Sequence, residues 1–152
     1  MRSLNEPIEI LIADDDEEDR MLIADALKES RLKNKIQMVE NGEELIEYLT
    51  HKGQFSDPMK YPKPGLILLD LNMPRKDGRE ALKEIKAFKN LRSIPIIILT
   101  TSKAEEDILR SYDLGVNSFI TKPVTFTSMV DVMKTLNKYW FEIVELPSGK
   151  DK

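Results

Sequence analysis

Three short runs of aliphatic residues stand out along the chain, at residues 8–13, 66–69 and 94–99. Each run is too short for a helix and rich in branched side chains, a combination typical of strands buried on both faces of a sheet. Two weaker runs, at residues 36–39 and 118–121, favour two further strands. The pattern therefore predicts five strands.

Segments with the apolar spacing of helices follow each of these runs. Their apolar residues recur every three or four positions, as expected for helices with one buried face. They are Ile23 and Leu27; Leu45, Ile46 and Leu49; Ala81, Leu82, Ile85 and Phe88; Ile108, Leu109 and Tyr112; and Met129, Met133, Leu136 and Trp140. Strict alternation of strands and helices requires right-handed crossovers and a mainly parallel sheet covered on both faces. We therefore expect a doubly wound α/β fold.

The segment between the second predicted helix and the third strand, residues 52–64, is rich in Gly, Pro and Lys. Its composition and length are typical of an exposed excursion from a compact domain. His51, the single histidine of the chain, precedes this segment without other candidate catalytic groups. We expect His51 to be a surface residue without a chemical role.

In doubly wound sheets, ligands bind beyond the carboxyl ends of the strands, near the point where the strand order reverses. Residues able to carry chemistry follow four of the five predicted strands. They are Asp14 and Asp15 after the first strand, Asp70 and Asn72 after the third, Thr100 after the fourth and Lys122 after the fifth. No glycine-rich phosphate-binding loop follows the first strand, which weakens nucleotide-binding alternatives.

Carboxylates from two strand ends, Asp14 and Asp15 on one and Asp70 on the other, would repel one another unless a positive charge intervened. Their oxygens, with the backbone carbonyl of Asn72, suit a hard cation such as Mg²⁺ or Mn²⁺ better than zinc. The sequence therefore predicts a divalent metal site at this edge of the sheet. The acidic residues 16–19 that follow are typical of a first helical turn, which the helix dipole favours.

A second set of groups would surround Asp70 with positive charge and hydrogen-bond donors. Lys122 supplies a cation and Thr100 a hydroxyl. Leu71 and Thr101 supply backbone N–H groups. With a bound cation, these groups would neutralise the three oxygens of a phosphoryl group attached to Asp70. The candidate chemistry is formation of an acyl phosphate.

Composition narrows the function classes. At 152 residues, with 41% hydrophobic and 33% charged residues, the chain fits one folded domain. A formal net charge of -4 without a basic block disfavours nucleic-acid binding. The sequence has no cysteine, which fits a reducing compartment, and no apolar run approaches the roughly 18 residues of a membrane span. We expect a cytoplasmic protein that binds neither nucleic acid nor membranes.

The strand-end residues belong to motifs that follow one another along nearly the whole chain. The motifs are the acid pair Asp14-Asp15, residues 68–74 with the sequence LLDLNMP, Asp77-Gly78, Thr100 and Lys122-Pro123. In this order and spacing they resemble the receiver domain of two-component response regulators. The resemblance implies a flavodoxin-like (βα)5 sandwich with five parallel strands in the order 2-1-3-4-5.

The resemblance also implies roles for the acidic residues. Asp70 would accept a phosphoryl group from a phosphohistidine on a sensor histidine kinase or a phosphotransfer protein. Asp15, Asp70 and the carbonyl of Asn72 would ligate Mg²⁺, with Asp14 acting partly through water.

Three further residues would respond to the phosphoryl group. Thr100 would donate a hydrogen bond to it, and Lys122 would pair with it. Phe119, three residues before Lys122, would be the aromatic switch residue whose rotamer couples to Thr100. Because the chain ends about 30 residues beyond Lys122, we expect a single-domain regulator that is not an enzyme beyond its own phosphorylation and dephosphorylation, and whose output is a protein contact.

A narrower resemblance is to the response regulators that pair with bacterial phytochrome kinases. It rests on the insert before residues 64–66, on residues 111–117, and on two tail motifs at residues 139–141 and 146–147. The cognate kinase is accordingly expected to be of phytochrome type.

The end of the chain carries apolar residues beyond the expected receiver core. We expect a receiver domain at residues 1–141 and a tail at residues 142–152. Ile143, Val144 and Leu146 have little left in their own domain to cover, and such residues in series favour an interface. The tail is therefore a candidate dimerisation arm of a homodimer.

Two other functions remain open. An Mg²⁺-dependent phosphohydrolase would also use an Asp nucleophile on an α/β sheet. Such an enzyme needs a second acid close after the nucleophile and a cap domain, whereas Asn72 is an amide and residues 53–64 are too few for a cap. A receiver-like adaptor that takes no phosphoryl group is the third alternative, and the intact acidic site argues against it.

Overall fold

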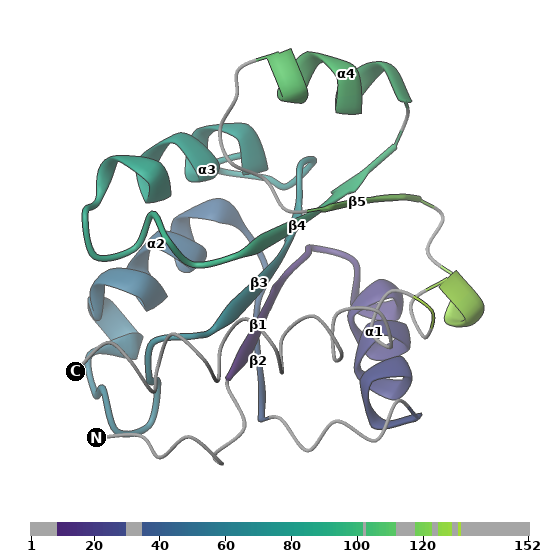
Figure 1. Cartoon of the computed structure of the whole chain (residues 1–152). Coiled ribbons are helices and arrows are strands. Elements are labelled where there is room, and N and C mark those ends of the chain that lie inside the picture. Colours follow the sequence, from purple (N-terminus) through teal and green to yellow (C-terminus); the bar gives the residue numbers. More distant parts are fainter. Residues whose placement is uncertain are drawn as a thin grey trace, which may run out of the picture.

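The computed structural model describes residues 9–29, 35–101, 103–111, 118–122, 125–128 and 131. Five parallel strands form one sheet in the order β2-β1-β3-β4-β5 (Figure 1). The strands are β1 (Ile10–Ala13), β2 (Ile36–Val39), β3 (Leu66–Asp70), β4 (Ile96–Thr100) and β5 (Ser118–Thr121). The chain reverses its direction of travel across the sheet between β1 and β3, which confirms the predicted doubly wound fold and its 2-1-3-4-5 order.

Four α-helices and one short 3₁₀ turn connect the described strands or follow them. They are α1 (Glu17–Glu29), α2 (Gly42–Thr50), η1 (Gly53–Phe55), α3 (Gly78–Ala87) and α4 (Lys103–Ser111). The first four predicted helices are thereby confirmed. The apolar residues of the fifth, Met129 to Trp140, and the tail at residues 142–152 lie outside the described residues.

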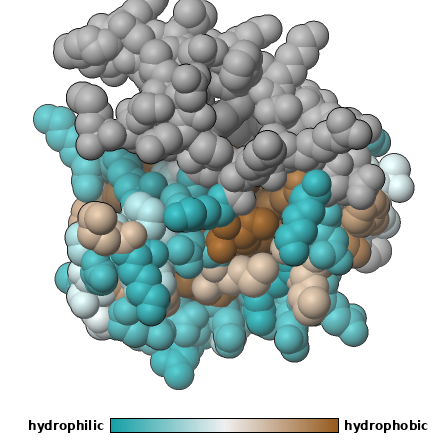
Figure 2. Space-filling model, turned by 90° about the horizontal axis from the view of Figure 1, so that it is seen from below, coloured by the Kyte–Doolittle hydropathy of each residue, from teal (hydrophilic) through white to brown (hydrophobic). Residues whose placement is uncertain are grey.

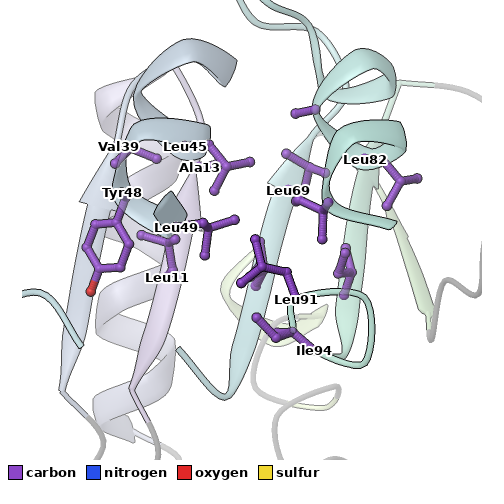
Figure 3. Packing of buried hydrophobic residues seen from close by; sticks show 14 of the residues in the cluster. Leu11, Ala13, Val39, Leu45, Tyr48, Leu49, Leu69, Leu82, Leu91 and Ile94 are labelled. Atoms are coloured by element: carbon purple, nitrogen blue, oxygen red, sulfur yellow. The ribbon is translucent and has the colours of Figure 1, made fainter. Parts of the chain in front are cut away.

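The sheet separates two hydrophobic clusters, because successive side chains of a strand point to opposite faces. On one face, Leu11 and Leu69 pack with Leu45 of α2 and Leu82 of α3 (Figure 3). On the other face, alternate strand residues pack with Ile23 and Leu27 of α1 in a second cluster. The inner strands are therefore apolar on both faces up to their last residues, Ala13 in β1, Asp70 in β3 and Thr100 in β4, of which the last two are polar.

The strand register brings the carboxyl ends of four strands to one edge of the sheet. Ala13 lies opposite Leu69, so the next residue on each strand is an aspartate, Asp14 and Asp70. On the other side of β3, Asp70 lies opposite Leu99, and Thr100 lies opposite Thr121. Parallel pairing thus gathers residues that are far apart in the sequence.

Two helices begin with a glycine because the loop after β3 packs against their first turns. A Cβ at Gly78 would meet the backbone of Asp70 and lie 2.7 Å from Leu71 Cα. A Cβ at Gly42 would lie 2.8 Å from the carbonyl carbon of Lys76, and the Gly42 N–H donates to that carbonyl at 2.9 Å. The loop that follows Asp70 is therefore held between α2 and α3.

The excursion at residues 52–64 is only partly exposed, and the prediction of an exposed excursion is wrong for its aromatic residues. Phe55 has 5% of its surface exposed and packs with Tyr48 and Tyr61, with ring centroids 5.0–5.7 Å apart. The Tyr48 hydroxyl also donates to the carbonyl of Pro62 at 3.0 Å. Three aromatic rings thus fasten the excursion to α2.

Two residues near helix ends differ from expectation. Phe88 belongs to the predicted apolar face of the third helix, yet α3 ends at Ala87 and Phe88 is 39% exposed. His51 is partly buried rather than a plain surface residue. It follows α2 in the left-handed conformation, and its ring Nε2 lies 2.8 Å from the Tyr61 carbonyl.

The end of the molecule opposite the strand carboxyl ends is mostly hydrophilic over the described residues, with hydrophobic side chains gathered in one central area (Figure 2). This agrees with the 33% of charged residues in the sequence, since charged side chains are mostly exposed. Among the residues that the structure describes, no helix combines the length and the apolar character needed to cross a membrane.

Candidate functional site

Asp70 is the last residue of β3 and has 1% of its surface exposed. Four buried aliphatic residues precede it, so the strand delivers its carboxylate to the edge of the sheet. The backbone N–H of Asn72 donates to Asp70 Oδ1 at 3.0 Å, and the ammonium group of Lys122 donates to Oδ2 at 3.1 Å. Both carboxylate oxygens are therefore held in a fixed orientation.

Lys122 follows β5 and contacts three carboxylates at once. Its Nζ lies 3.1 Å from Asp70 Oδ2, 3.1 Å from Asp19 Oδ2 and 3.3 Å from Asp14 Oδ2. Burial opposes the charged form of the side chain, but these carboxylates outweigh it and raise the pKa of Lys122 above its ordinary value. Lys122 is therefore a permanent cation at the centre of the acidic group.

Asp14 follows β1 and is completely buried. Its Oδ1 accepts the backbone N–H of Asp16 at 2.9 Å. Its Oδ2 lies within ion-pair distance of Lys122 but receives no hydrogen bond from the described residues. Burial raises the pKa of Asp14 from 3.8 to about 7, and the nearby Asp70 carboxylate adds to this effect. Burial likewise raises the pKa of Asp70.

The carboxylates of Asp14, Asp15 and Asp70 form one cluster, with a ligand oxygen of each within 4.8 Å of the others. Asp15 is exposed and, with Pro74 and Arg75, lines an open hollow of about 600 Å³, so solvent reaches the cluster. The donors are all oxygens, and Asp14 Oδ2 lacks a hydrogen-bond donor among the described residues. This donor set fits a hard divalent cation such as Mg²⁺ or Mn²⁺.

Thr100 and Phe119 lie on the two strands beyond β3. Thr100 ends β4 in a buried position, and its hydroxyl has no hydrogen-bond partner among the described residues. Phe119 lies opposite Ile98 in the register of β4 and β5, and its partly buried ring packs on the cluster beneath α2 and α3. The Thr100 hydroxyl can therefore donate to a ligand at the strand ends.

The two backbone N–H groups expected to donate to phosphoryl oxygens, those of Leu71 and Thr101, both donate to other acceptors in the unphosphorylated structure. The Leu71 N–H donates to the Leu99 carbonyl at 3.2 Å. The N–H and the hydroxyl of Thr101 both donate to Glu105 Oε1, at 3.0 Å each. Strand pairing occupies one donor, and a side chain of α4 occupies the other.

Glu105 joins three segments at the edge of the site. Besides its two bonds from Thr101, it accepts a hydrogen bond from the Asn72 side chain, and its Oε2 lies 3.6 Å from the guanidinium group of Arg79. Partial burial opposes ionisation of Glu105. The hydrogen bonds from Thr101 and Asn72 and the charge of Arg79 outweigh it, so the pKa of Glu105 lies below its ordinary value.

Sequence reasoning missed Asp19 and Glu105 as neighbours of the site. The interpretation of residues 16–19 as a first helical turn holds for Asp16, which accepts the Glu18 N–H at 2.9 Å. It does not account for Asp19, which contacts Lys122. Asp19 lies in the first turn of α1, only a few residues after Asp14 and Asp15, and this proximity in the sequence could have indicated it.

The sequence profile of the response regulator receiver domain matches residues 10–134. This span covers most of the chain and contains every site residue described above. The chain therefore belongs to the response regulator receiver domain family, whose members are two-component signalling proteins.

Individual relatives resemble this chain over most of its length. Response regulator Rcp1 of Synechocystis sp. is 37% identical over 145 residues, which are 95% of this chain and 97% of Rcp1. The solved structure of bacteriophytochrome response regulator RtBRR has a TM-score of 0.78 at 37% identity and covers 86% of this chain and 78% of its own. That of the phosphorylated cyanobacterial phytochrome response regulator RcpA has a TM-score of 0.76 at 38% identity, over 89% and 94% of the two chains. A Mn²⁺-bound structure of Rcp1 has a TM-score of 0.75 at 36% identity, over 90% and 96%.

Replacing Asp14 with Asn is expected to stabilise the metal-free protein at neutral and higher pH. The pKa of Asp14 is about 7 in the folded protein and 3.8 when unperturbed, so the folded state binds more protons between these two pH values. Wild-type stability therefore falls as the pH rises through this window, and Asp14→Asn avoids a loss on the order of 4 kcal/mol. Thermal unfolding at pH 8 and at about pH 4 measures the difference.

Asp15→Asn is the matched control, because Asp15 belongs to the same cluster but is exposed. Its stability should stay within about 0.5 kcal/mol of wild type at both pH values. Equal melting temperatures of Asp14→Asn and wild type at pH 8 would contradict the destabilising effect assigned to the buried, ionised Asp14 carboxylate.

Proposed function

We propose that this chain is a response regulator whose Asp70 accepts a phosphoryl group from a sensor histidine kinase or a phosphotransfer protein. The observation that carries the proposal is the buried Asp70 carboxylate with the Lys122 ammonium 3.1 Å from one oxygen and the Asp14 and Asp15 carboxylates beside it. A nucleophilic carboxylate fixed beside a cation and a metal-binding cluster is the arrangement that phosphoryl transfer to Asp requires.

The residues of the chain have separate tasks in this proposal. Asp70 attacks phosphorus as the bond from phosphorus to the donor breaks, and the Asn72 N–H keeps the carboxylate oriented. Lys122 neutralises the charge of the transferred group, and the Thr100 hydroxyl, buried and without a partner among the described residues, donates to it. A cation bound by Asp14, Asp15, Asp70 and the Asn72 carbonyl would supply further charge neutralisation.

The proposed donor is a kinase of phytochrome type. RtBRR and RcpA are named as phytochrome-linked response regulators, and each is similar to this chain over at least 78% of its own length. Phosphoryl groups passed on by kinases come from ATP, so we also propose a cytoplasmic location.

Asp70→Asn is expected to abolish phosphorylation, because the amide lacks the nucleophilic oxygen anion. Incubation with Mg²⁺ and a small acyl-phosphate donor, followed by intact mass measurement, should add one phosphoryl group to the wild type and none to the variant. Asp25→Asn, on the exposed face of α1, is the control and should be labelled like wild type. Labelling of Asp70→Asn on another residue would contradict the assignment.

We propose that the cation is Mg²⁺ and that Asp15 binds it directly while Asp14 acts partly through water. Asp15 is the exposed member of the cluster, whereas Asp14 is buried and already accepts the Asp16 N–H. Asp15→Ala should therefore weaken Mg²⁺ binding more than Asp14→Ala, by about tenfold or more. Titration calorimetry of the full chain compares the two. Equal phosphorylation rates with and without excess chelator would contradict the metal requirement.

The proposed output is a change of protein contacts, transmitted through Thr100 and Phe119. Thr100 ends β4 with a buried hydroxyl that can turn toward the phosphoryl group, and Phe119 lies on the neighbouring strand. We propose that the responding surface comprises α4, β5 and the segment after β5, and that two copies associate through this surface and the tail at residues 142–152.

Removal of the tail is expected to weaken self-association, because Ile143, Val144 and Leu146 supply apolar surface for a reciprocal contact. Sedimentation velocity of the full chain and of a form ending at Phe141, each with and without a phosphoryl analogue, measures this at micromolar concentration. The full chain should sediment as a dimer and the shortened form as a monomer. Monomers throughout would contradict the proposed homodimer.

A further inference from the structure

Glu105 occupies the hydrogen-bond donors that follow β4. Its Oε1 accepts both the backbone N–H and the hydroxyl of Thr101, at 3.0 Å each. The Asn72 side chain also donates to this carboxylate, and Arg79 of α3 lies 3.6 Å from Oε2. The carboxylate thus lies between Asn72, two residues after Asp70, and Thr101, one residue after Thr100.

The same local arrangement occurs at the start of α2. There the Glu44 Oε1 accepts the backbone N–H of Glu40 at 2.8 Å, four residues back along the chain, as Glu105 does from Thr101. A glutamate in the first turn that reaches back to an N–H before the helix is a common stabilising cap. The cap at α2 follows β2, which carries no phosphoacceptor, whereas the cap at α4 uses a donor beside the Asp70 site.

We propose that Glu105 competes with the phosphoryl group of Asp70 for the donors of Thr101, so that phosphorylation displaces Glu105 and loosens the first turn of α4. This inference rests on the proposed function. It adds a residue that no motif identifies, and it makes Glu105 a positioning residue that holds the edge of the site in the unphosphorylated arrangement.

The physical basis is competition between two anions for one set of donors. A phosphoryl group has three oxygens to neutralise, and Lys122, the Thr100 hydroxyl and a cation leave room for a backbone N–H next to Thr100. The carboxylate of Glu105 holds that N–H in the unphosphorylated protein. Once the phosphoryl group takes the N–H, Glu105 loses that hydrogen bond and faces a second anion, so its cap on the first turn of α4 is released.

Glu105→Gln is the test variant, because it keeps the shape of the side chain and removes its charge. A neutral acceptor competes less well for an N–H than a carboxylate does. Titration calorimetry with beryllofluoride, a phosphoryl analogue, and Mg²⁺ should therefore show about tenfold tighter binding to Glu105→Gln than to wild type. Glu44→Gln is the matched control, which removes the equivalent cap from α2 and should bind beryllofluoride within about twofold of wild type.

A second readout follows Glu105 itself in the full chain. Saturation with beryllofluoride and Mg²⁺ should move the carboxyl carbon resonance of Glu105 in the NMR spectrum and leave that of Glu44 in place, because only Glu105 loses the hydrogen bonds from Thr101. An unmoved Glu105 resonance in saturated protein would overturn the inference.

The outcomes separate this inference from the proposed function. If the wild type binds beryllofluoride and Glu105→Gln binds it no more tightly, the competition is absent while the phosphoacceptor role stands. If Glu44→Gln gains as much affinity as Glu105→Gln, loss of any helix cap explains the change and the inference fails. If the wild type binds no beryllofluoride in the presence of Mg²⁺, the proposed function fails and the inference fails with it.

Discussion

The burial of two like charges side by side is the constraint on which the rest of the site depends. Asp14 and Asp70 are withdrawn from water at adjacent strand ends, and each resists ionisation there. The single ammonium group of Lys122 bridges them and reaches a third carboxylate, Asp19. One cation against three acids leaves the group short of positive charge. The group is therefore left with excess negative charge, which a bound divalent cation would offset.

Most of the fold and the centre of the site were accessible from the sequence. Aliphatic runs and helical spacing are local signals, and strict alternation of the two leaves few topologies. Parallel strands then place the residues after Ala13, Leu69 and Thr121 at one edge whatever their separation along the chain. Asp14, Asp70 and Lys122 could be grouped on this rule alone, before any coordinates.

The remaining features depend on side-chain packing, which has no sequence period. Asp19 and Glu105 look like ordinary acids of a first helical turn, and only the placement of α1 and α4 against the strand ends brings them to Lys122 and Thr101. The Thr101 N–H was expected to be available to a ligand because the sequence does not show which acceptor a backbone N–H will find. The sequence assigns the Thr101 N–H to a ligand, whereas in the structure it donates to the Glu105 side chain of α4.

The packing of Phe55 and Tyr61 on Tyr48 determines which part of residues 52–64 is free to change in sequence. The excursion joins the end of α2 to the start of β3, so it leads toward the amino ends of the strands. Phe55 and Tyr61 anchor the excursion to Tyr48, whereas at its tip the Met59 side chain is 89% exposed and adds little to the packing. Substitutions at this tip would leave the three anchoring rings and the acidic cluster in place, so the surface chemistry of the loop can vary independently of the strand-end site.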